Sequence, residues 1–158
     1  MARGRQAVDL DPSLFITRFM LGTAALYSGR RVDALRELEI ASQLSEGLPE
    51  VRGMLGYAYV TVGDTTRARE ILLELERLGP RPAATVPIAR ISLALGDTAK
   101  ALDHLERAAY QRSPFFASES MASPIFEPLR GSPRFAALVG AVGLDAGRLR
   151  QPVGVARR

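Results

Sequence analysis

Small and apolar residues recur along this chain at a fixed interval. Gly29, Gly63 and Gly96 stand 34 and 33 residues apart, and an alanine follows each of them five positions later. A period of this length predicts stacked helical hairpins, because each repeat forms two helices that bury their apolar face only against a neighbouring repeat.

Counting back from the glycines gives three units of similar length: 15–48, 49–81 and 82–114. In the second unit, apolar residues follow helical spacing on both sides of Gly63, where the first helix must end. The aspartates that follow two of the glycines, Asp64 and Asp97, are suited to cap the next helix, and the glycines themselves tolerate a left-handed conformation. The first unit has Arg30 at this place, so its second helix lacks the cap.

Two further segments flank the repeats. Residues 1–12 contain Ala7 and Pro12 at the spacing expected for the end of a repeat, so we expect the remnant of a preceding unit whose first helix is missing. Residues 114–144 carry Ser-Pro steps, in which serine caps and proline begins a short helix. We expect this segment to cover the third hairpin as a C-terminal cap.

The pattern of Leu-Gly, Tyr, Gly, Ala and Pro resembles the tetratricopeptide repeat over about residues 7–113, most closely in the second unit. This resemblance implies an all-α fold, a right-handed α-solenoid of helix-turn-helix hairpins with a C-terminal helical cap. Residues 86–135 resemble the C-terminal repeat module of bacterial signalling proteins, which is typically joined to a kinase, cyclase or winged-helix domain. The resemblance implies either a C-terminal fragment or a stand-alone relative of such a module.

Charge and composition limit the kinds of partner and of chemistry that we expect. The net charge is +4, but residues 13–144 are nearly balanced, and residues 145–158 hold four arginines against one aspartate. We expect a disordered basic tail there and no nucleic-acid binding, because the excess does not form a face of a folded element. Cysteine is absent, so disulfides and thiol chemistry are excluded.

Membrane association is not expected either. The longest apolar run, 135–144, is well short of the roughly 20 residues that span a bilayer, and no secretory signal is recognisable. We therefore expect a cytoplasmic protein.

Residue types that could support catalysis are few. His104 is the only histidine, and it lies in a helical pattern without a recognisable triad. The carboxylates Glu70, Glu74 and Glu76 fit the solvated face of a helix better than a metal site. We expect no enzyme activity, no metal and no cofactor.

The remaining candidate is the concave surface formed by the first helix of each hairpin, which holds a peptide or protein domain in the family that the chain resembles. Its predicted contact residues are Phe19, Thr23, Leu26, Tyr27, Tyr57, Thr61 and Arg90. Some members of this family bind a terminal carboxylate through Lys and Asn, and other residues occupy those positions here. This favours an apolar or amphipathic partner. Arg90 is then available for a carboxylate or carbonyl of that partner.

Two alternatives stay open. The aromatic residues can instead pack the interfaces between hairpins. The chain can also act as a regulatory or oligomerising segment, because the missing helix leaves an N-terminal edge for a signalling domain or for a second copy in a homodimer.

Overall fold

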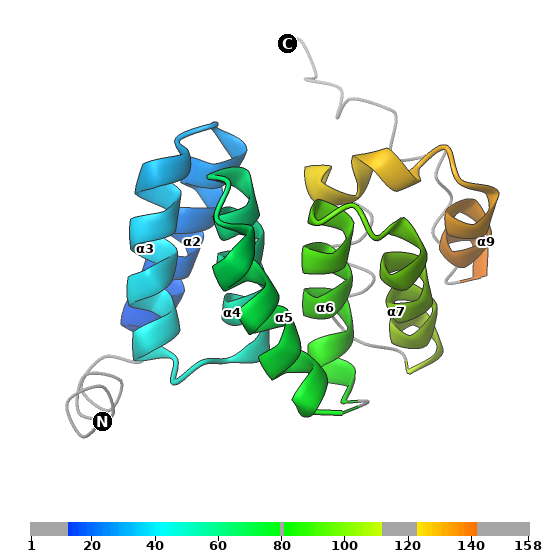
Figure 1. Ribbon diagram of the computed structural model, residues 1–158, viewed down its shortest axis with the longest axis horizontal. Helices are drawn as coiled ribbons and strands as arrows, with labels where there is room; N and C mark the ends of the chain where they lie inside the picture. The colour runs from blue at the N-terminus through cyan, green and yellow to red at the C-terminus, as the bar shows by residue number, and fades with distance from the viewer. Residues whose placement is uncertain (1–12, 80, 112–122, 142–158) are drawn as a thin grey trace, which may run out of the picture.

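The computed structural model describes residues 13–79, 81–111 and 123–141, and these are helices joined by turns (Figure 1). Consecutive helices form three hairpins: α2 (Ser13–Tyr27) with α3 (Arg31–Leu44), α4 (Pro49–Thr61) with α5 (Thr65–Arg77), and α6 (Pro82–Ala94) with α7 (Thr98–Tyr110). A 3₁₀ helix, η1 (Pro124–Leu129), and the short helix α9 (Pro133–Ala141) follow. The expected all-α solenoid of stacked hairpins is confirmed. The predictions for residues 1–12 and 145–158 lie outside the described ranges.

The turns inside the hairpins follow the sequence rules. Gly63 and Gly96 adopt φ values of +88° and +89°, which favour glycine because it lacks a Cβ atom. Asp64 then accepts a hydrogen bond from the backbone N–H of Arg67, and Asp97 accepts one from that of Lys100. No side chain caps α3. The predicted difference between the first hairpin and the other two is therefore confirmed.

Stacking of the second and third hairpins depends on a close approach of α4 to α6. A Cβ atom added to Gly53 would lie 2.5 Å from the Cβ atom of Pro87, which stands inside α6. One turn along α4, a Cβ atom on Gly56 would collide with Ile91. Glycine at both positions lets the two helices pack at a distance that a larger residue would prevent.

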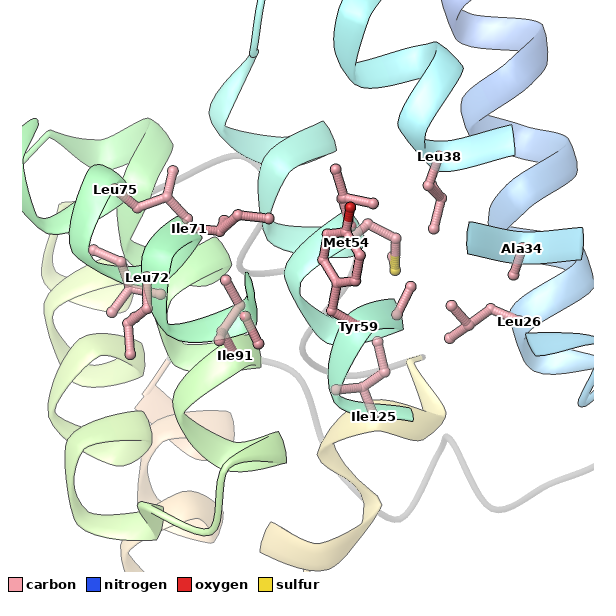
Figure 2. Close-up of a cluster of buried hydrophobic side chains, with 14 of the residues drawn as sticks. Leu26, Ala34, Leu38, Met54, Tyr59, Ile71, Leu72, Leu75, Ile91 and Ile125 are labelled. Carbon is pink, nitrogen blue, oxygen red and sulfur yellow. The ribbon is translucent and has the colours of Figure 1, made fainter. Parts of the chain in front are cut away.

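The buried apolar side chains form two clusters. The first joins the first two hairpins and α6, and Figure 2 shows Leu26, Leu38 and Met54 within it. Ile125 of η1 also belongs to this cluster. The second cluster joins α6 and α7 to the C-terminal segment through Phe126, Leu129, Phe135 and Val139.

The Gly53 contact generates a stability prediction. Gly53→Ala should lower the free energy of unfolding by about 1–3 kcal/mol, because the new methyl group meets the backbone and ring of Pro87. Gly140→Ala is the matched control, since Gly140 is also helical and a Cβ atom there meets nothing within 4 Å. Urea unfolding of both variants measures the difference. Equal stability of the two would contradict the close approach of α4 to α6.

Candidate functional site

The side of α2, α4 and α6 that carries the predicted contact residues is here called the inner face. Phe19 and Tyr57 are partly buried and pack against the first core cluster. Leu26 is buried within that cluster. Tyr27 differs from these three, because 46% of its surface is exposed. Packing between hairpins thus accounts for Leu26 and for part of Phe19 and Tyr57, whereas Tyr27 is exposed over nearly half of its surface.

The chain's own C-terminal segment lies on the inner face. The hydroxyl oxygens of Tyr27 and Ser123 share a hydrogen bond of 3.0 Å across 96 residues of sequence. Ser123 also accepts a hydrogen bond from the backbone N–H of Ile125, which caps η1 as the Ser-Pro step predicts. Ile125 and Phe126 are buried against the first and second clusters respectively. Part of the inner face is therefore occupied from within the molecule.

Arg90 does not serve as a free group for a partner. Its side chain is 0% exposed, and its Nη2 atom lies 2.7 Å from Oε1 of Glu50. The pair links α6 to α4 across the hairpin interface, beside the close approach at Gly53. The expectation that Arg90 is available for a partner carboxylate is corrected accordingly, because the carboxylate that it binds is the protein's own.

The two threonines of the predicted site have different surroundings. The hydroxyl of Thr61 donates to the carbonyl oxygen of Ala58 at 2.7 Å, a local bond within α4. The hydroxyl of Thr23 is buried and has no hydrogen-bond partner among the described residues. Thr23 stands between Phe19 and Tyr27 at intervals of four residues, so the three share one side of α2.

Electrostatics keep the tyrosine hydroxyl of this face neutral. Burial raises the pKa of Tyr57, and the nearby Tyr27 raises it further, while Arg31 and Arg90 act in the opposite direction. A protonated tyrosine hydroxyl donates and accepts hydrogen bonds. Arg90 is paired with Glu50, so beside the nearby Arg31 the inner face presents mainly aromatic rings and hydroxyl groups.

The histidine and the carboxylates that could support catalysis lie on α5 and α7, apart from the inner face. His104 is partly buried on α7, and burial lowers its pKa below the ordinary value of 6.5. Glu74 and Glu76 form ion pairs with Arg52 and Lys100. Within residues 13–79, 81–111 and 123–141, no group of three or more histidine or carboxylate side chains is placed to hold a metal ion.

None of the helices that the structure describes combines the length and apolar character needed to cross a bilayer.

Comparison with known proteins gives one match. A family model described as Tetratricopeptide repeat matches residues 82–107, which cover most of the third hairpin. No curated protein and no solved structure matches the chain. The family match, together with the stacked hairpins, supports a tetratricopeptide repeat protein. Such repeats generally mediate protein–protein interaction, and the family is generally non-catalytic.

The buried Arg90–Glu50 pair yields a prediction. Glu50→Ala should lower the free energy of unfolding by about 3–5 kcal/mol, because it removes the carboxylate that neutralises a fully buried guanidinium group. The double variant Glu50→Leu with Arg90→Met should lose less, since no buried charge remains.

Glu127→Ala is the control for this experiment. It removes an exposed partner of Arg130 at 2.9 Å, and exposed pairs contribute at most about 1 kcal/mol. Urea unfolding compares the variants. A Glu50→Ala protein as stable as Glu127→Ala would show that the pair is not effectively buried.

Proposed function

We propose that this protein is a non-enzymatic interaction scaffold that binds an apolar or amphipathic peptide or domain on its inner face. The observation that carries the proposal is the exposed ring of Tyr27 beside the partly buried Phe19 and Tyr57. Aromatic residues of this kind, with an apolar body and a hydroxyl at the end, are enriched at binding hot spots.

The chemistry of the inner face favours an uncharged contact. Arg90 and Glu50 neutralise each other, and Phe19, Thr23 and Tyr27 follow one side of α2 without a charge between them. An amphipathic helix with its apolar side on α2, or an extended apolar segment, matches such a surface. Ser123 and Ile125 border this surface, because η1 already covers the part of the inner face next to Tyr27.

Truncating the tyrosines tests this function. After affinity capture identifies a binding protein, Tyr27→Ala and Tyr57→Ala should each weaken its binding by about 1–3 kcal/mol, the range for an aromatic contact at the centre of an interface. Tyr110→Ala is the matched control, because Tyr110 is 90% exposed on α7. Calorimetry gives the affinities, and circular dichroism verifies folding. Both variants binding every captured protein as tightly as the control does would refute the proposal.

A second candidate function is a regulatory or oligomerising segment of a larger bacterial signalling protein with a kinase, cyclase or transcription-regulator domain. The N-terminal edge, formed by the exposed residues Met20 and Leu21 of α2, favours this second function. Met20 is 65% exposed and Leu21 is also exposed, whereas their equivalents one repeat later, Met54 and Leu55, are buried. Arg18 is the only charged residue of α2, and it pairs with Glu37 at 2.7 Å. The exposed edge is therefore apolar, as expected for a surface that another domain or a second copy covers.

Self-association tests the edge. The wild-type chain should form dimers whose population rises with concentration, and Leu21→Glu should remain monomeric because a carboxylate cannot be buried there without a partner. Leu48→Glu is the control, since Leu48 is similarly exposed but lies between α3 and α4. Multi-angle light scattering gives the masses. A wild-type monomer at all concentrations would remove the homodimer.

A further inference from the structure

A pocket outside the inner face lies between the second helices of two neighbouring hairpins, α5 and α7, over α6. Figure 1 shows α6 between these two helices. The pocket has a volume of about 320 Å³. Its lining residues come from three helices and one turn. They are Arg69, Leu72, Leu73 and Glu76 of α5, Ser92 of α6, Leu95 and Asp97 of the turn after α6, and Lys100 of α7.

Three leucines give the pocket an apolar surface. Leu72 is buried, and Leu95 is partly buried. Leu73 is 52% exposed, although its neighbours on the outer side of α5 are charged. An exposed leucine that lines a pocket together with two other leucines offers a site for an aliphatic side chain, because covering it removes apolar surface from water.

The charged side chains around these leucines differ in whether they already have a partner within the protein. Lys100 forms an ion pair with Glu76. A carboxylate oxygen of Asp97 accepts the backbone N–H of Lys100 at 3.0 Å, which caps α7. Arg69 forms no ion pair with any carboxylate among the described residues. The pocket therefore has one cation that is not neutralised, next to its apolar surface.

Ser92 adds an unused polar group to the wall. Its side chain is 0% exposed, and its hydroxyl has no hydrogen-bond partner in the described part of the chain. Buried hydroxyl groups normally form hydrogen bonds, because an unsatisfied one retains its desolvation cost. An unsatisfied hydroxyl in the wall of a pocket is consistent with a partner that is supplied by a ligand.

We infer that this pocket binds a peptide segment in which an aliphatic side chain stands next to a carboxylate. The side chain contacts the three leucines, the carboxylate pairs with Arg69, and a backbone group of the segment hydrogen-bonds with Ser92. The volume is at the lower end for ligand sites, which suits one residue and its carboxylate rather than a long segment. This site shares no residue with the inner face, so it stands or falls independently of the function proposed above.

Titration of the full chain with N-acetyl-leucine tests the inference, with N-acetyl-leucinamide as the matched probe that lacks the carboxylate. Backbone amide resonances of Leu73, Ser92 and Leu95 should shift and saturate with the acid. The amide should bind about fivefold more weakly, as expected for the loss of one partly screened charge pair. Nitrogen–proton correlation spectra follow both titrations.

Two variants assign the roles within the pocket. Arg69→Gln should bind acid and amide equally, and Leu73→Ser should weaken both. Arg77→Gln is the control, because Arg77 is an exposed arginine on α5 that does not line the pocket. The inference is overturned by any of three results: no saturable shifts at the pocket amides, equal affinity of the wild type for the two probes, or an unchanged preference for the acid in Arg69→Gln.

Discussion

The close packing of α4 against α6 is the constraint on which the rest of this structure depends. Gly53 admits the ring of Pro87, and the guanidinium of Arg90 passes the same glycine, with Nη1 3.3 Å from where a Cβ atom would be. This brings Arg90 to Glu50 on α4. The two charged groups of a buried ion pair meet in only one relative position of the two helices. Gly53, Pro87 and the ion pair therefore together define how the third hairpin stacks on the second.

The same interface determines which part of the inner face is used for packing between hairpins. Because Arg90 and Glu50 are used between hairpins, they give no charged anchor to a ligand. Phe126 closes the region next to α6 by joining the second core cluster. The aromatic surface around Tyr27 remains exposed, and it offers a partly exposed ring and a hydroxyl group. The inner face is thus divided into a part that stabilises the fold and a part that remains open.

The sequence predicted the features that local rules decide and missed the contacts between distant positions. The glycine register gave the hairpins, and Asp64 and Asp97 gave the caps, because local rules decide them. The contact of Tyr27 with Ser123 joins two positions outside any period, so no spacing indicates it. The Glu50 and Arg90 pair had a signal that was not used: both occupy inward positions of neighbouring first helices, where opposite charges can meet.

Helix α2 differs from α4 and α6 because it belongs to two surfaces at once. One side packs on α3, a second carries Tyr27 on the inner face, and a third exposes Met20 and Leu21 at the N-terminal edge. At the other end of the solenoid, Phe135 and Val139 of α9 cover the equivalent apolar surface. Among the described residues, Met20 and Leu21 on α2 therefore stay exposed at one end of the solenoid, whereas α9 covers the other end. Because Phe19 and Met20 are adjacent in the sequence, the inner face and the N-terminal edge border each other on α2, so the two proposed functions are distinguished by substitutions on separate sides of this helix.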